Sequence, residues 1–253
     1  MATESADVDV PKPKKRFIPL ENNPEVMTTL LHRLGLAPQL SWTDVYSITD
    51  PDLIAFLPRP SFALLLVFPV NEIYTKFRQE EDADKPEYSG FGAGEEVIWF
   101  KQTIQNACGL YGLLHAVGNG AARAQITRGS ELDDIFSRAV NLDPRKRSDL
   151  LNDSSALEQA HQEAANRGDS AVPNIEDEVE LHYVCFVKST QGHLWEMDGG
   201  RKGPICRGKL GPEDDMLSEA ALDLGPRAFL KREEAAGGGD LRFGIVSLGQ
   251  SFD

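Results

Sequence analysis

Cys108 is the residue of this sequence best suited to covalent chemistry, because it stands at the start of an apolar helical stretch that runs to Val117. Asn106 is a favourable N-cap residue, so Cys108 is expected in the first turn of that helix. Free N–H groups and the positive end of a helix dipole stabilise a thiolate there, and the small neighbours Ala107 and Gly109 leave room for a substrate. The pattern predicts a cysteine nucleophile, against the simpler interpretation of a small buried apolar side chain.

The glutamine six residues before this cysteine, Gln102, falls just outside the expected helix. Its side-chain amide can fold back toward the sulfur. Together with the backbone N–H of Cys108, it would then donate hydrogen bonds to an oxyanion that develops on an attacked carbonyl. These two residues therefore predict acyl-transfer chemistry with a thiolate nucleophile.

A thiolate nucleophile needs a base, and His182 is the best placed of the five histidines. It opens an apolar strand, and a hairpin turn centred near Thr190 would place Asp198 opposite it. Paired residues of antiparallel strands have Cα atoms ~4.5–5.5 Å apart, so the Asp198 carboxylate is expected to orient the His182 ring. Taken alone, Asp198 and the two glycines after it would be an ordinary strand-ending turn. His115 lies about 10 Å along the cysteine helix, too far to act. Three histidines are expected in solvent: His32, His161 and His193.

The elements that must position these residues follow from hydrophobic periodicity, caps and turns. We expect helices at 24–34, 49–56, from 70 into the acidic stretch 79–87, and at 107–117, 130–140, 144–151, 155–166, 212–223 and 226–233; strands are expected at 62–68, 183–187, 194–197 and 241–248. Helices come mostly early and strands mostly late, which predicts an α+β fold with an antiparallel sheet. No linker divides the chain, so residues 16–253 are expected to form one domain after a flexible arm, residues 1–15.

Composition narrows the function further. The 253 residues include 26 Lys+Arg against 40 Asp+Glu, and the net charge of −14 argues against nucleic acid and favours a basic partner. Three cysteines argue for a reducing compartment, the cytoplasm, and no zinc-ligand spacing is present. We expect no secretory signal, and the longest apolar stretch, 62–70, is shorter than the ~20 residues of a membrane span. The basic segment 11–16 is either a weak nuclear address or part of the solvated arm.

Five stretches carry a family resemblance, in this order along the chain: Pro19-Leu-Glu-Asn-Asn-Pro-Glu-Val26, Gln102 with Cys108-Gly109, His182 at the head of a strand, Gly192-His-Leu-Trp-Glu-Met-Asp198-Gly199, and Leu241-Arg-Phe243. Together they resemble the ubiquitin C-terminal hydrolase family of cysteine peptidases, over residues 16–253 and in its short, single-domain form. The resemblance implies Cys108 as nucleophile, His182 as general base and then acid, Asp198 as its orienting residue and Gln102 as oxyanion donor. It implies no cofactor and no metal.

The resemblance also implies a papain-like core, with a central antiparallel sheet between two helical lobes and a knotted chain path. A crossover loop at about 166–181 would straddle the cleft. Leu20 and Glu21 would bind the substrate. The acidic loop residues Glu176, Asp177 and Glu178 would either meet the basic C-terminal tail of ubiquitin or form only a solvated loop. The implied activity is hydrolysis of bonds after the C-terminal glycine of ubiquitin by a monomer, favouring small or unfolded leaving groups. A ubiquitin-like substrate, a non-catalytic ubiquitin-binding scaffold and a Cys-His-Asp acyltransferase remain open alternatives.

Overall fold

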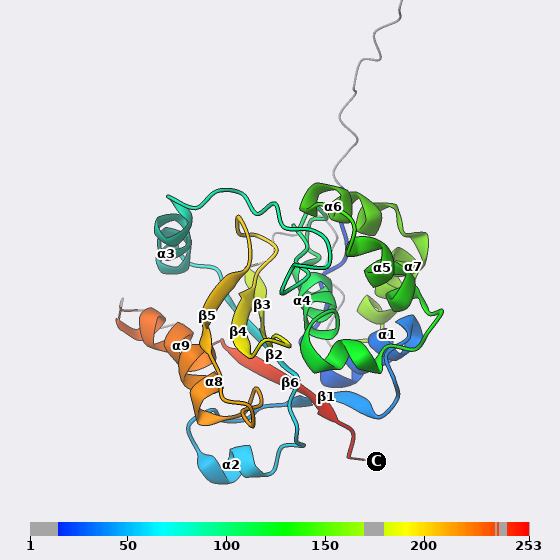
Figure 1. The fold of residues 1–253 in the computed structure, drawn as a ribbon. Helices are drawn as coiled ribbons and strands as arrows, with labels where there is room; N and C mark the ends of the chain where they lie inside the picture. The colour runs from blue at the N-terminus through cyan, green and yellow to red at the C-terminus, as the bar shows by residue number, and fades with distance from the viewer. Residues whose placement is uncertain (1–14, 170–179, 236, 238–241, 253) are drawn as a thin grey trace, which may run out of the picture.

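A six-stranded antiparallel sheet forms the centre of the computed structural model, which describes residues 15–169, 180–235, 237 and 242–252. Its order is β1-β6-β2-β3-β4-β5. The strands are β1 (Leu40–Asp44), β2 (Ala63–Pro69), β3 (Leu181–Lys188), β4 (His193–Met197), β5 (Ile205–Lys209) and β6 (Gly244–Gln250). The predicted α+β fold with an antiparallel sheet is confirmed (Figure 1).

Helices cover both faces of this sheet (Figure 1). One group comprises α1 (Pro24–Leu34), α4 (Cys108–Val117), α5 (Glu131–Ala139), α6 (Pro144–Asp153) and α7 (Ser155–Ala165), with the 3-10 helix η1 (Gly120–Gln125). The other comprises α2 (Pro51–Ala55), α3 (Glu72–Asp82), α8 (Glu219–Leu224) and α9 (Pro226–Ala235). The two predicted helical lobes are therefore present, while the knotted path stays a prediction.

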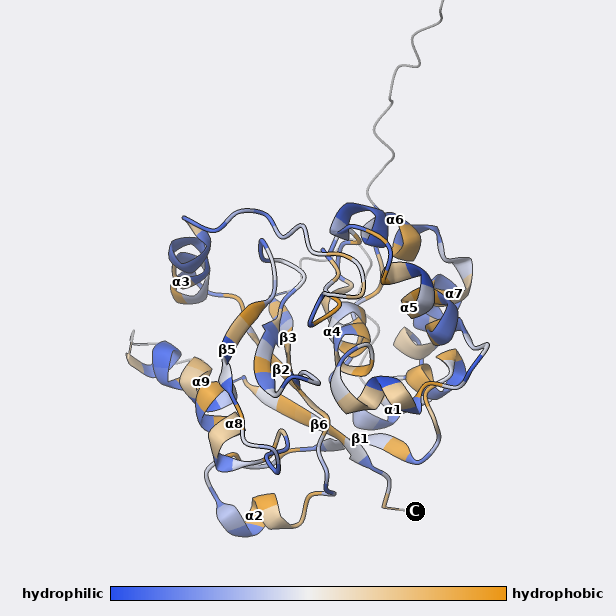
Figure 2. Cartoon of the chain, in the orientation of Figure 1, coloured by the Kyte–Doolittle hydropathy of each residue, from blue (hydrophilic) through white to orange (hydrophobic). Residues whose placement is uncertain are grey.

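The central strand β2 shows why the chain builds two cores. Every residue of β2 is buried, and successive side chains point to opposite faces of a strand. Leu65 and Val67 accordingly pack with the α4 group, whereas Leu64, Leu66 and Phe68 pack with the α3 group. Apolar residues follow the strands, and polar residues cover α3 and α6 on the outside (Figure 2).

Helix α1 illustrates how local signals fix an element beside the site. Asn23 caps it by accepting hydrogen bonds from the N–H groups of Glu25 and Val26, and Pro24 occupies the first helical position. Gly35 ends it in the left-handed region with φ 114°, donating back to Leu31 and His32. This helix was predicted with these same bounds.

Some elements differ from expectation. Strands β1 and β5 were not predicted, and the helix expected at 212–223 begins only at Glu219. The side chains of Asp214 and Asp215 accept backbone hydrogen bonds from Gly211 and Leu217, so this segment forms turns instead. Helix α3 ends at Asp82, before the end of the acidic stretch.

Two expectations about the ends of the chain reach past the described residues. The predicted arm, residues 1–15, lies outside the described residues except for its last residue. Residue 241, the first of the predicted strand 241–248, also lies outside them. Among the described helices, none combines the length and the apolar character needed to span a bilayer.

Candidate active site

Cys108 lies in the first turn of α4, as predicted, but the helix begins at Cys108, one residue later than expected, and its N-cap is Ala107 and not Asn106. Asn106 adopts the left-handed conformation with φ 60° and turns the chain into the helix, a conformation that asparagine tolerates better than most residues. The N-cap residue Ala107 makes no side-chain hydrogen bond to the helix. The first turn of α4 carries a cysteine that is 8% exposed, beside the N–H groups that a helix start leaves without intrahelical partners.

The small residue after the cysteine serves close packing. A Cβ atom on Gly109 would lie 3.2 Å from Cβ of Leu20 and 3.4 Å from the ring of Tyr183. The Tyr183 hydroxyl in turn donates a hydrogen bond to the Leu20 carbonyl at 3.2 Å. The space beside Gly109 is thus filled by protein, which corrects the expectation that small neighbours leave it open for a substrate. These contacts also hold the segment around Leu20 against the start of α4.

The His182 ring joins the cysteine to the carboxylate. Its Nε2 lies 2.8 Å from Oδ1 of Asp198, which leaves the other ring nitrogen for Cys108, whose side chain contributes to the raised pKa of His182. Burial lowers the pKa of His182, but attraction to Asp198 and hydrogen bonds with Asp198 and Cys108 outweigh it and raise the pKa to about 10. Burial alone would raise the pKa of Asp198; the charge and hydrogen bond of His182 instead hold it below its usual range.

His182 and Asp198 are in contact, as predicted. They are not directly opposite each other on the paired strands, so the predicted register is wrong. Lys188 pairs with Leu194, which centres the hairpin at Gln191 and not at Thr190. Continued past the end of β4, that register brings Gly200 opposite His182, and a Cβ on Gly200 would lie 3.8 Å from the ring. The Asp198 side chain therefore reaches His182 diagonally across the strands.

The Asp198 carboxylate has further partners that the sequence did not reveal. The Tyr74 hydroxyl donates to its Oδ2 at 2.6 Å, and the Gly200 N–H donates to its Oδ1 at 2.7 Å. The Trp99 indole donates to the Asp198 backbone carbonyl at 3.1 Å. Tyr74 is 124 residues away in the chain, so no spacing pattern connects it to this site.

Gln102 lies in an extended segment that α4 side chains hold in place. The Phe100 N–H donates to Nε2 of His115 at 3.0 Å, and the Thr103 N–H donates to the Tyr111 hydroxyl at 3.3 Å. The Gln102 N–H donates to the carbonyl of Gly199 at 2.9 Å, which ties this segment to the residue after Asp198. One side-chain N–H of Gln102 donates to Ile104 at 3.1 Å, and the amide carries a second one.

The other histidines take structural positions. The prediction that His161 is solvated is wrong: it is fully buried, packs at a tilt against the Phe17 ring and hydrogen bonds with the Ile18 carbonyl at 2.7 Å. Burial lowers the pKa of both His161 and His115 to about 4. His32 and His193 are partly exposed. Within the described part of the chain, no group of three His, Cys, Asp or Glu residues is arranged to hold a metal ion.

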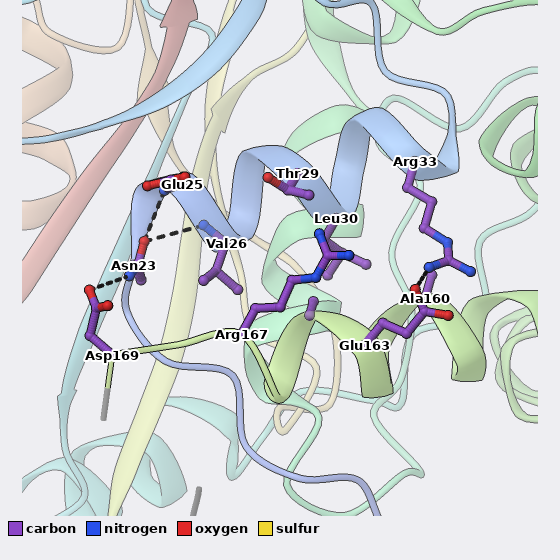
Figure 3. A pocket seen from close by; sticks show the side chains of 11 residues that line it. Asn23, Glu25, Val26, Thr29, Leu30, Arg33, Ala160, Glu163, Arg167 and Asp169 are labelled. Carbon is purple, nitrogen blue, oxygen red and sulfur yellow. Dashed lines mark hydrogen bonds and ion pairs between the residues drawn. The ribbon is translucent and has the colours of Figure 1, made fainter. Parts of the chain in front are cut away.

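The predicted substrate contacts are only partly visible. Leu20 is buried and Glu21 lies against Gly168, whereas Glu176, Asp177 and Glu178 lie outside the described residues. The described start of the predicted crossover loop is tied to α1, because the Asn23 amide donates to Asp169 at 3.4 Å (Figure 3). This contact borders a cavity of about 320 Å³ between α1 and α7, which none of the four predicted catalytic residues lines.

Known proteins with similar sequences cover nearly the whole chain. Ubiquitin carboxyl-terminal hydrolase 3 of Arabidopsis thaliana is 34% identical over 92% of this chain and 94% of its own. Ubiquitin carboxyl-terminal hydrolase YUH1 of Saccharomyces cerevisiae is 33% identical over 94% and 98%. The isozyme L1 of Rattus norvegicus is 34% identical over 91% and 96%.

The fold has solved counterparts as well. The UCH37 catalytic domain of Trichinella spiralis, crystallised with ubiquitin vinyl methyl ester, superposes with a TM-score of 0.71 at 18% identity, covering 93% of this chain and 95% of that one. The sequence pattern of ubiquitin carboxyl-terminal hydrolase, family 1, matches residues 17–224. With that match and curated relatives above 30% identity along most of their length, the chain belongs to the ubiquitin carboxyl-terminal hydrolase family 1.

Proposed function

We propose that this protein is a cysteine-type deubiquitinating hydrolase, with Cys108 as nucleophile, His182 as general acid and base, Asp198 as the residue that orients His182, and Gln102 as an oxyanion donor. The observation that carries this proposal is the His182 ring, which bridges a buried carboxylate and the cysteine at the open start of α4. The names of the curated relatives supply the substrate class, bonds at the C-terminus of ubiquitin.

In the proposed reaction the attacking form of Cys108 is the thiolate, and the His182 imidazolium lies beside it. The raised pKa of His182 keeps its ring protonated at neutral pH, and the dipole of α4 together with the imidazolium favours the negative sulfur. Asp198 contributes by accepting the Nε2–H of His182, so that Nδ1–H points at Cys108. Because thiolates are stronger nucleophiles than thiols, the enzyme needs no further base for the first step.

Acylation follows from this arrangement. The Cys108 sulfur attacks the carbonyl carbon of the C-terminal glycine, the S–C bond forms, and the carbonyl electrons move to oxygen. The Cys108 N–H and the second side-chain N–H of Gln102 stabilise that oxyanion. When the intermediate collapses, the bond to the leaving group breaks, and His182 gives its Nδ1 proton to the departing amine, alkoxide or thiolate.

Deacylation returns the site to its starting state. Neutral His182 removes a proton from a water molecule, and the resulting hydroxide attacks the thioester carbon. The C–S bond breaks, the thiolate is regenerated opposite the imidazolium, and the ubiquitin carboxyl group leaves. No cofactor takes part in these steps.

We propose further that residues 16–253 act as one catalytic domain and as a monomer. The crossover loop at about 166–181 would limit access and favour small or unfolded leaving groups, with Leu20 and Glu21 on the substrate side of the cleft. A reducing location such as the cytoplasm suits a working thiolate. Comparing a ubiquitin–peptide fusion with a ubiquitin fusion to a stable folded domain tests the leaving-group preference: equal rates would contradict it.

The deciding experiment uses Cys108→Ser with Cys206→Ser as its matched control, because Cys206 is also a free cysteine but is exposed on β5. Cys108→Ser should abolish cleavage of a fluorogenic C-terminal amide of ubiquitin, and Cys206→Ser should cleave at the wild-type rate. Normal turnover by Cys108→Ser would refute the nucleophile assignment. A wild-type protein that binds ubiquitin but neither cleaves the amide nor reacts with an electrophilic ubiquitin probe would instead be a binding scaffold.

A further inference from the structure

The Asp198 carboxylate is held from three directions at once. His182 of β3 and the Gly200 N–H both bind Oδ1, at 2.8 and 2.7 Å. Oδ2 receives its hydrogen bond from the hydroxyl of Tyr74 on α3, at 2.6 Å. Asp198 has no exposed surface and Tyr74 is only 1% exposed, so water does not compete for these positions.

We propose that Tyr74 is a positioning residue for the hydrolysis, because its hydroxyl fixes the rotation of the Asp198 carboxylate and thereby the direction in which the His182 ring faces Cys108. This inference rests on the proposed function of the same site. The Tyr74 hydroxyl acts through Asp198, while the Tyr74 ring lies tilted beside the His182 ring, with the ring centroids 6.2 Å apart.

The Asp198 side chain needs a restraint on the rotation of its carboxylate group. The terminal torsion of an aspartate side chain is broad and roughly two-fold, so packing alone fixes it poorly. With Tyr74 on Oδ2, a rotation of the carboxylate would break a short hydrogen bond to a buried charged oxygen, which is among the costlier bonds to lose. The orientation that satisfies Tyr74 is also the one that presents Oδ1 to Nε2 of His182.

Tyr74 is itself firmly placed. Its ring packs edge-on against Phe68 at 4.6 Å and at a tilt against Phe229 at 5.7 Å, and the Arg78 guanidinium lies over it at 5.6 Å. Burial, and next the charge of Asp198, raise the pKa of Tyr74 far above its ordinary value, so the hydroxyl remains a donor wherever the enzyme works. In the hydrogen bond between Tyr74 and Asp198, the Asp198 carboxylate is ionised and the Tyr74 hydroxyl keeps its proton.

Helix α3, which carries Tyr74, is anchored at both ends. At its start, the Asn71 amide donates to Glu233 of α9 at 2.8 Å. At its end, Glu81 and Asp82 pair with the fully buried guanidinium of Arg201, at 2.6 and 2.7 Å. Arg201 is the third residue after Asp198, so the same short segment that bears the carboxylate also holds the helix that restrains it.

The test removes one oxygen atom and keeps the ring. Tyr74→Phe should lower kcat for the fluorogenic ubiquitin amide about tenfold, in the range expected for a modest misplacement of a reacting group, while KM stays within about twofold because Tyr74 does not contact substrate. The matched control is Tyr88→Phe, which also removes a hydroxyl that donates to a carboxylate, that of Glu95 at 2.8 Å. This control should leave kcat and KM unchanged.

A second measurement reads the geometry without turnover. The ring proton between His182 and Asp198 should give a far-downfield proton NMR signal, identified by its absence in His182→Ala. Tyr74→Phe should shift or broaden that signal, and Tyr88→Phe should not. An unchanged signal with wild-type kcat in Tyr74→Phe would overturn the inference, as would an equal loss of kcat in the control. An inactive wild type would refute the proposed function alone, and the NMR comparison would still decide the role of Tyr74.

Discussion

Replacing Gly199 by alanine tests how the oxyanion donor is held. A Cβ atom at residue 199 would lie 2.9 Å from Cβ of Gln102, 3.1 Å from its backbone nitrogen and 3.2 Å from the carbonyl oxygen of Phe100. Two of these three atoms belong to the backbone, so no side-chain rotation relieves the contact. Ordinary contact begins near 3.4 Å, and the segment that carries Gln102 must therefore move away by about 0.5 Å.

This movement has a calculable cost. A misplacement of about 1 Å lowers the rate about 100-fold, so half that distance should lower kcat about tenfold. Complete loss of an oxyanion donor costs about 10²–10³-fold, and Gln102→Ala should fall in that range. Overpacking at a buried site also lowers the free energy of unfolding by about 1–3 kcal/mol.

The assay is steady-state cleavage of the fluorogenic ubiquitin amide, with Gly94→Ala as the control. A Cβ atom on Gly94 meets no other atom within 4 Å, so this variant should retain wild-type kcat. Combining Gly199→Ala with Gln102→Ala separates the causes, because the alanine at 199 should cost little more once the donor is absent. A Gly199→Ala enzyme with wild-type kcat, or a double variant that loses a further tenfold, would refute the reasoning.

Two further predictions concern stability. Arg147→Met should lower the free energy of unfolding by about 3–5 kcal/mol, because Arg147 is fully buried and its loss leaves the Glu95 carboxylate without its cationic partner. In the same denaturant titrations Arg138→Met, which removes an exposed pair with Asp134, should change the free energy of unfolding by less than about 1 kcal/mol. His161 has its pKa lowered from 6.5 to about 4 by burial, so below pH 6.5 the unfolded chain binds the extra proton and stability falls until about pH 4. His161→Gln should reduce that acid-induced loss by about 3 kcal/mol, and an identical pH dependence in the variant would contradict the assignment.

The strands that the sequence did not predict are the two edges of the sheet, β1 and β5. Central strands such as β2 are buried on both faces and read as continuous apolar runs. Edge strands bury less and tolerate polar residues, as in the Ile205–Lys209 segment, whose middle residue is an arginine. Hydrophobic pattern therefore identifies the centre of this sheet better than its borders.

In the candidate site, too, some features were predictable from the sequence and others were not. Cys108, His182 and Asp198 were predicted and come together, because a helix start and a hairpin are local features that spacing can express. The cap residue, the register and the partner Tyr74 were not predicted. These depend on the left-handed turn at Asn106, on a hairpin centred one residue later than expected and on a contact across 124 residues of chain, none of which leaves a periodic signal.

The position of β6 has a consequence for biosynthesis. This strand is the last of the described elements, yet it lies inside the sheet and pairs with both β1 and β2. Synthesis proceeds from the N-terminus at about 5–20 residues per second. Strand β1, and the edge of β2 that pairs with β6, therefore have no partner strand until the ribosome has passed residue 250. The nascent chain therefore exposes two unpaired strand edges for seconds, and unpaired edges of this kind are prone to pair with other chains.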